Sequence, residues 1–126
     1  MGLILCSSGE NESSASLLRI VKTAVRNHAI EILFSIGELS ERLRQPLGDI
    51  NVAVLYAAER SELLEMISLG DLLGEIRVVL VLPDSRPETL NKAHILHPRF
   101  IAASRNDYRY LGNVLKKMMF VYDNAH

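Results

Sequence analysis

The sequence predicts an α/β fold in which helices cover both faces of a five-stranded parallel sheet. Five short apolar runs alternate with five segments of helical periodicity along the 126 residues, a pattern typical of βαβ units. Three runs are almost wholly apolar, as expected of central strands. The other two, one charged and one short, favour edge positions. Right-handed crossovers then give the strand order 2-1-3-4-5 in a three-layer α/β/α sandwich.

The amino-terminal half contains the first three predicted strands. Leu3–Cys6 is followed by a polar stretch, Ser7 to Ser14, that offers N-caps for the first helix. The second strand, Ile30–Ile36, contains the charged Glu31, and a short helix follows it that we expect to end near Pro46. The third strand, Ile50–Tyr56, is almost wholly apolar. The inward-facing residues of the two helices are predicted from their spacing: Leu17, Leu18, Val21, Ala24 and Val25 in the first, and Leu39, Leu43 and Leu47 in the second.

The third and fourth helices flank the fourth predicted strand, Ile76–Leu82. Ser61 is placed to cap the third helix, which a glycine at position 70 or 74 is expected to end. Ser85-Arg86-Pro87-Glu88 predicts the start of the fourth helix, as a capping box with proline in the first turn. That helix stops before Pro98.

A short fifth strand and a long helix end the chain. Phe100–Ala103 is the strand, and Asn106 or Asp107 is placed to cap the helix. The helix has a regular apolar stripe, which predicts an inner face made of Leu111, Val114, Leu115, Met118 and Tyr122.

Composition predicts one domain spanning residues 1–126 in the cytoplasm. A single cysteine fits a reducing compartment, and no apolar run approaches the length that crosses a bilayer.

Residues 1–85 carry 7 basic and 12 acidic side chains, whereas residues 86–126 carry 7 basic and 3 acidic ones. The net charge of −1 argues against nucleic acid as a partner, and the charge gradient favours a protein partner or a second copy of the chain.

The ends of the predicted strands carry polar residues but no catalytic set. In such folds the chemistry lies just beyond the carboxyl ends of the strands. No phosphate loop, metal-ligand set or catalytic triad occurs there, so we expect no catalytic residue, metal or cofactor. A small polar crevice remains the candidate binding site, lined by Ser7, Ser8, Tyr56, Asp84 and Ser104.

This arrangement resembles the receiver domain of bacterial response regulators, which has a flavodoxin-like fold, over essentially the whole chain. That family binds magnesium through two acidic residues after strand one and phosphorylates an aspartate that ends strand three. Here the acidic pair falls at about Ser7 and Ser8, and the phosphoacceptor near Val54 to Tyr56. The family's Thr or Ser falls near Leu82 or Pro83, and its Lys near Ala103 or Ser104.

None of the family's functional residues is present. Without converging carboxylates magnesium lacks charged ligands, and without the aspartate no acyl phosphate forms. The resemblance therefore implies a receiver-like module that cannot be phosphorylated and that signals by protein contact. The surface it implies is that of the fourth helix, fifth strand and fifth helix, with these candidate interface residues: Arg99, Arg105, Tyr108 and Arg109.

Two other functions remain open. Leu5-Cys6-Ser7-Ser8-Gly9 resembles the start of phosphotransferase-system B components, in which a cysteine after strand one is phosphorylated. It is also similar to low-molecular-weight tyrosine phosphatases at the cysteine. Cys6 at the start of the first helix would then be the catalytic residue, although Glu10 and Glu12 would repel phosphate. A small-molecule sensor that uses the crevice without chemistry is the third hypothesis. We favour the binding module over the enzyme.

Overall fold

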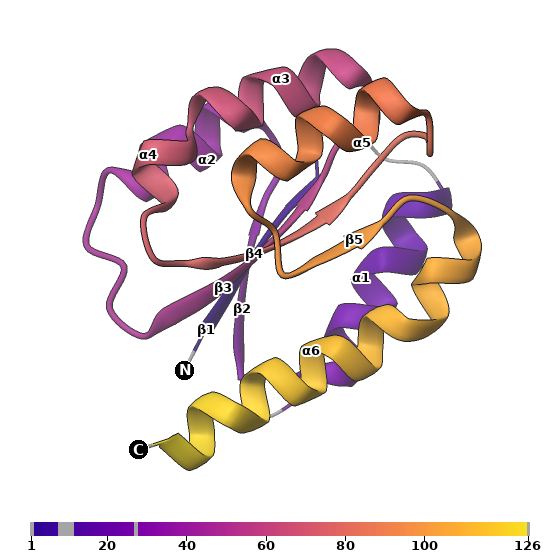
Figure 1. Cartoon of the computed structure of the whole chain (residues 1–126). Helices are drawn as coiled ribbons and strands as arrows, with labels where there is room; N and C mark the ends of the chain where they lie inside the picture. Colours follow the sequence, from indigo (N-terminus) through magenta and orange to yellow (C-terminus); the bar gives the residue numbers. More distant parts are fainter. Residues whose placement is uncertain (1, 8–11, 27, 126) are drawn as a thin grey trace.

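The five strands form one parallel sheet in the order β2-β1-β3-β4-β5 (Figure 1). The computed structural model describes residues 2–7, 12–26 and 28–125. The predicted fold class and strand order are confirmed. Strand bounds differ from prediction by a residue or so at most ends, and they are β1 Gly2–Ser7, β2 Ala29–Leu33, β3 Ile50–Tyr56, β4 Arg77–Val81 and β5 Phe100–Ala102.

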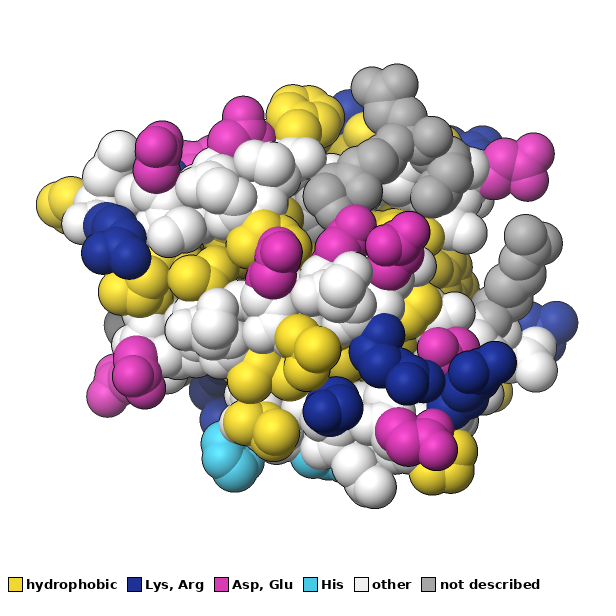
Figure 2. All heavy atoms as spheres, turned by 90° about the horizontal axis from the view of Figure 1, so that it is seen from above, with side chains coloured by type: hydrophobic (Ala, Val, Ile, Leu, Met, Phe, Trp, Pro, Cys, Tyr) yellow, Lys and Arg dark blue, Asp and Glu magenta, His cyan; other side chains and the backbone are white. Residues whose placement is uncertain are grey.

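Helices cover both faces of the sheet, as the alternating pattern predicts. On the lower face in Figure 1 lie α1 (Glu12–Ala24) and α6 (Arg105–Ala125). The upper face, which Figure 2 shows from above, carries α2 (Ile36–Leu43), α3 (Arg60–Ser68), α4 (Gly70–Leu73) and α5 (Pro87–Ala93). A single 3-10 turn, η1 (His94–Leu96), follows α5.

The core consists of two apolar layers, one on each side of the sheet. Successive residues of a strand point to opposite faces, so Leu3 and Leu5 pack with α1 and α6. Ile4 and Cys6 belong to the other layer, together with Leu39 of α2. Cys6 therefore lies on the side of the sheet opposite α1. Leu111, Leu115 and Met118 are buried on α6 as predicted, and the side chain of Tyr122 lies outside the described part.

The second and third helices begin at residues other than those that the sequence predicts. The second strand ends at Leu33 rather than Ile36, because Ser35 is the N-cap of α2 and its hydroxyl accepts a hydrogen bond of 3.0 Å from the Glu38 N–H. The N-cap of α3 is Glu59, so the prediction for Ser61 was wrong and Ser61 lies inside the helix. A serine is the N-cap of α2, whereas the serine at the start of α3 is not a cap, so residue type by itself does not fix the N-cap.

The second and third helices end close to the predicted positions, whereas the last two helices begin at other residues than predicted. The second helix stops at Leu43, before Pro46. Leu69 separates α3 from the four-residue α4, which ends at Gly74 with a φ of +54°. The helix predicted from Ser85 begins at Pro87 with Arg86 as its N-cap, so Ser85 is not the cap. The last helix begins at Arg105, before either predicted cap.

The charged residue in the edge strand β2 has a structural partner. The Nε of Arg42 on α2 donates to Oε2 of Glu31 at 2.5 Å, so the carboxylate is paired against the covering helix. A charged side chain on an edge strand also discourages that strand from pairing with a strand of another chain.

Candidate functional site at the carboxyl ends of the strands

The carboxyl ends of β1 and β3 bring two of the predicted crevice residues together. Ser7 and Tyr56 are register partners on neighbouring parallel strands, where the strand order reverses and such folds bind ligands. The hydroxyl of Ser7 is buried and has no hydrogen-bond partner within the described part of the chain. Tyr56 is 7% exposed, and its side chain packs in the apolar layer between the sheet and the helices α1 and α6. Ser8, a further predicted crevice residue, lies outside the described residues.

Asp84 and Ser104 follow the next two strands of the sheet, but both are engaged in their own loops. Oδ1 of Asp84 accepts a hydrogen bond of 3.0 Å from the Arg86 N–H. A hydrogen bond from the Thr89 side chain, together with that backbone N–H, holds the pKa of Asp84 below its ordinary value. The N–H of Ser104 donates to Oδ2 of Asp107 at 3.1 Å.

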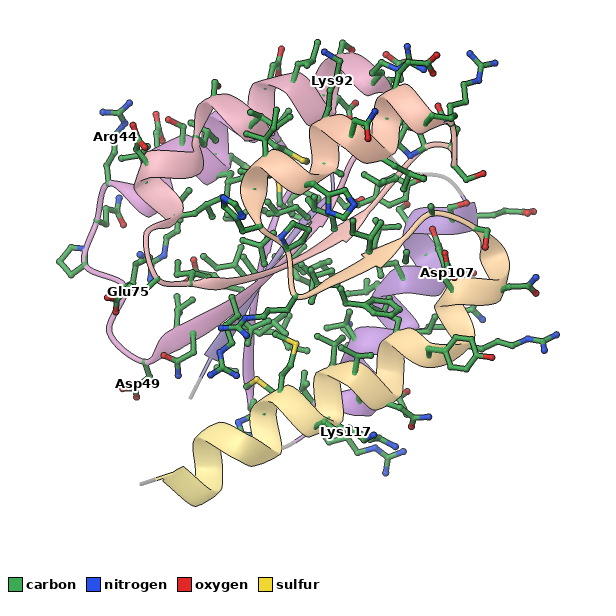
Figure 3. The ribbon with its side chains drawn as sticks, in the orientation of Figure 1. Arg44, Asp49, Glu75, Lys92, Asp107 and Lys117 are labelled. Carbon is green, nitrogen blue, oxygen red and sulfur yellow. The ribbon has the colours of Figure 1, made fainter. Side chains whose placement is uncertain are left out.

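Three further carboxylates lie along this edge, and each binds the backbone just before its own helix. Oε2 of Glu38 accepts from the Phe34 N–H at 2.5 Å, and Oε2 of Glu62 accepts from the Ala58 N–H at 3.0 Å. Oδ2 of Asp107 accepts from Ala103 at 2.8 Å as well as from Ser104. Figure 3 shows Asp107 at the start of α6, close to the end of β5.

These contacts use the groups that would otherwise bind an anion. Backbone N–H groups after the strands and at helix starts are the usual phosphate donors of such folds, and after β2, β3 and β5 they already bind carboxylates. Those carboxylates are also spread along the edge rather than convergent. No group of three or more His, Cys, Asp or Glu residues able to hold a metal ion is present in ranges 2–7, 12–26 and 28–125.

Sequence reasoning placed Asp107 at the cap of the last helix but missed Glu38 and Glu62, and for Glu38 a signal exists. Ser35 and Glu38, and likewise Ser104 and Asp107, lie at positions i and i+3, the spacing of a capping box. The only capping box that the sequence analysis singled out was Ser85 with Glu88. There Glu88 instead lies 4.0 Å from Nη2 of Arg60.

Cys6, the candidate nucleophile of the alternative hypothesis, is fully buried. Its thiol donates to the Ser35 carbonyl oxygen at a sulfur–oxygen distance of 3.6 Å. Burial, together with the negative charges of Glu38 and Glu62, raises the pKa of the Cys6 thiol to about 12. Reactive cysteines have the opposite environment, with exposure and nearby positive charge.

A buried threonine ties the start of α3 to the start of α5. Thr89 is fully buried, and its Oγ1 accepts a hydrogen bond of 3.2 Å from Nε of Arg60. This hydroxyl also interacts with Asp84, so both sides of a buried polar group are satisfied. The network lies beside the crevice and orients the loop that follows β4.

The four candidate interface residues do not form one cluster. Arg99 lies in a hollow of about 590 Å³ at the amino ends of β4 and β5, near His97. Tyr108 and Arg109 line a separate groove between α1 and α6, so they lie on the α1 side of α6 rather than on its β5 side. Arg105 is the first residue of α6.

Two exposed apolar side chains flank the edge strand β5 instead. Ile95 of η1 is 59% exposed and Tyr110 of α6 is 60% exposed. Successive residues of an α-helix are rotated by about 100° around its axis, so Tyr110 lies about 160° around α6 from Gly112, which faces α1. Tyr110 is therefore on the side of α6 that is turned away from α1. We assign it to the face formed by α5, β5 and α6, which we call the β5 face.

No model of a protein family matches the sequence, and a comparison with curated proteins also finds no match. Solved structures do resemble it. A response regulator receiver domain from Methanospirillum hungatei shares 12% identity over 100% of this chain and 99% of its own, with a TM-score of 0.74. A two-component response regulator from Legionella pneumophila shares 14% identity over 93% and 99%, with a TM-score of 0.68.

A pilus assembly-related protein from Burkholderia pseudomallei is also similar, with 22% identity over 93% of this chain and 87% of that chain and a TM-score of 0.68. At these identities the similarity shows the fold alone. The chain has the flavodoxin-like fold of response regulator receiver domains, with the strand order 2-1-3-4-5. Among the described residues, no helix combines the length and apolar character needed to cross a bilayer.

Proposed function

We propose that this protein is a receiver-like signalling module that is not phosphorylated and that acts by binding other proteins. The observation that carries the proposal is the capping of the strand ends by Glu38, Glu62 and Asp107. Where a receiver gathers carboxylates around magnesium, this chain has the pair Ser7 and Tyr56. Its carboxylates are bound to backbone N–H groups instead.

The environment of Cys6 supports the same proposal over the enzymatic alternative. A phosphocysteine mechanism needs the thiolate at the amino end of the first helix. Cys6 packs with Leu39 in the layer on the other side of the sheet, and its raised pKa keeps the thiol protonated at neutral pH. A small ligand in the crevice remains the runner-up, because the buried Ser7 hydroxyl has no partner in the described part of the chain.

The proposal assigns partner contact to the β5 face, with a protein partner or a second copy of the chain as the occupant. Ile95 and Tyr110 supply exposed apolar area, and Arg99 supplies charge at one end of β5. Apolar anchors surrounded by a polar rim are typical of protein interfaces. The single buried cysteine fits a cytoplasmic location.

Incubation with acetyl phosphate and Mg²⁺, followed by intact-mass spectrometry, tests the central claim. We expect no added phosphate on the native protein and no change in its NMR spectrum with beryllofluoride. A covalent phosphate on any aspartate would overturn the proposal.

A thermal-shift screen with nucleotides and metabolites tests the sensor alternative, because a ligand at 100 times its dissociation constant adds about 2.7 kcal/mol.

The β5 face is tested by Ile95→Ser with Tyr110→Ser, compared with Leu64→Ser on α3, whose side chain is also exposed. We expect the double variant to weaken self-association in sedimentation velocity or crosslinking to partners, and Leu64→Ser to leave both unchanged. Equal behaviour of the two variants would contradict this assignment.

A further inference from the structure

The groove between α1 and α6 is lined by basic side chains on both of its walls. Arg19 lies on the α1 side, and Arg109 and Lys116 on the α6 side. None of the residues that line the groove is acidic, and its volume is about 510 Å³. Lys22 on α1 and Lys117 on α6 are exposed on the same two helices, and Figure 3 shows Lys117 on α6, below the sheet.

The floor of this groove is apolar and shallow because small residues line it. Ile20 and Ala24 of α1 face Gly112 of α6, where a Cβ would lie 3.6 Å from Cγ2 of Ile20. Tyr108 contributes a partly buried ring. Along α1 the floor runs from Ser16 to Ala24, about 12 Å or two helical turns.

Acidic side chains on these two helices do not cancel the charge of the walls. In the described part, Glu12 lies in the first turn of α1, one turn before Ser16, and does not line the groove. Asp107 binds the backbone N–H groups of Ala103 and Ser104. The positive walls are therefore available to an acidic ligand.

We propose that this groove, called here the α1–α6 groove, binds an acidic amphipathic helix of a partner protein. This inference rests on the proposed role as a protein-binding module, and it names the partner's chemistry. A helix laid in the groove would place apolar side chains at i, i+3, i+4 and i+7 on Ile20, Ala24 and Tyr108. Carboxylates on its two flanks would then meet Arg19 on one wall and Arg109 with Lys116 on the other.

Two other occupants fit these features less well. A nucleic-acid duplex would use the cations but not the apolar floor, and the net charge of −1 opposes nonspecific phosphate binding. A second copy would have to place a different, acidic surface in the groove. Such a head-to-tail contact builds a closed ring or an open polymer rather than the two-fold dimer that is commonest among oligomers.

The test uses a labelled peptide of about 18 residues with leucine at i, i+3, i+4 and i+7 and glutamate on both flanks. A scrambled peptide of the same composition is the control ligand. We expect the amphipathic peptide to bind more tightly in fluorescence anisotropy, and to shift the amide NMR signals of Ile20 and Gly112. Equal binding of the two peptides, or shifts elsewhere, would overturn the proposal.

Variants separate the groove from general charge. Arg19→Glu with Lys116→Glu should weaken peptide binding at least about tenfold. Arg44→Glu with Lys92→Glu, at the C-cap of α2 and on α5 above the sheet (Figure 3), makes the same change of net charge and should leave binding unchanged. Ile20→Ala should weaken binding without any charge change. Equal losses in the two double variants would overturn the proposal.

Two more measurements distinguish the alternatives. Displacement of the peptide by a short DNA duplex at lower concentration would assign the groove to nucleic acid, and self-association lost in Arg19→Glu would assign it to a second copy. Either result overturns the proposal. Phosphorylation by acetyl phosphate would refute the proposed function without changing peptide binding, so the two failures remain distinguishable.

Discussion

The Glu62 carboxylate accepts a hydrogen bond of 3.0 Å from the backbone N–H of Ala58, two residues beyond the end of β3. The contact joins the third residue of α3 to the loop in which a receiver domain would hold its phosphoryl group. Glu38 and Asp107 make the same contact at the starts of α2 and α6. The same contact between a carboxylate and a backbone N–H thus occurs after three strands. It stabilises the start of each helix and occupies N–H donors that an anion would need.

Glu62→Gln should destabilise the protein by about 1 kcal/mol, because it weakens both the capping contact and the favourable charge at the helix start. Urea unfolding measures the change. Glu65→Gln is the matched control, since Glu65 is exposed further along the same helix, and it should stay within about 0.5 kcal/mol of the native protein. Equal effects of the two substitutions would remove the assigned role of Glu62.

Cys6 should resist iodoacetamide until the protein unfolds. A thiol pKa of about 12 instead of 9.0 lowers the thiolate fraction at about pH 8 roughly a thousandfold, and burial adds a steric barrier. Mass spectrometry of native and urea-unfolded samples gives the comparison. Rapid labelling of the native protein would revive the enzymatic hypothesis.

The same raised pKa predicts how stability changes in alkali. The folded state holds the Cys6 proton more tightly than the unfolded state, so this contribution is complete below about pH 9 and is lost as pH rises toward 12. Cys6→Ala removes it, and the variant should lose less stability than the native protein between these limits. Parallel urea titrations of both proteins at several pH values provide the check.

Thr89→Val should raise the pKa of Asp84 toward its ordinary value of 3.8, because the Thr89 hydrogen bond is the main cause of the lowered pKa. Thr89→Ser retains the hydroxyl and should keep the pKa low. An NMR titration of the Asp84 carboxyl carbon distinguishes the two variants. The lowered pKa stabilises the fold above pH 3.8 and ceases to do so as pH falls below it, so Thr89→Val should also be less sensitive to acid.

Gly74→Ala and Gly37→Ala should change stability in opposite directions. Gly74 has φ +54° and ψ −120°, a conformation that costs other residues about 1–3 kcal/mol. Gly37 lies in α2, and a Cβ there meets nothing closer than Ser35 Oγ at 3.7 Å, so alanine should stabilise by up to about 1 kcal/mol. Thermal unfolding of both variants tests the pair, and a stable Gly74→Ala would contradict the backbone argument.

The fold class and strand order followed from the sequence because burial imposes a pattern on it. Strands β1, β3 and β4 are apolar on both faces, and only central parallel strands have that environment. The helix starts were predicted less well. Ser61 and Ser85 are good capping residues by type, yet Glu59 and Arg86 are the N-caps. Residue type by itself therefore does not fix the N-cap of these two helices.

The absence of a metal-binding and phosphorylation set at the strand ends is a prediction from the sequence, made because positions such as Ser7 and Tyr56 hold other residue types. Only the tertiary structure decided what those ends do instead. Whether a carboxylate converges on an ion or caps its own helix depends on where its oxygen points, and spacing along the chain does not determine that. The same holds for Cys6, whose side of the sheet follows from the strand pleat, and for Arg99 and Arg109, which the packing of α6 against α1 places in different hollows.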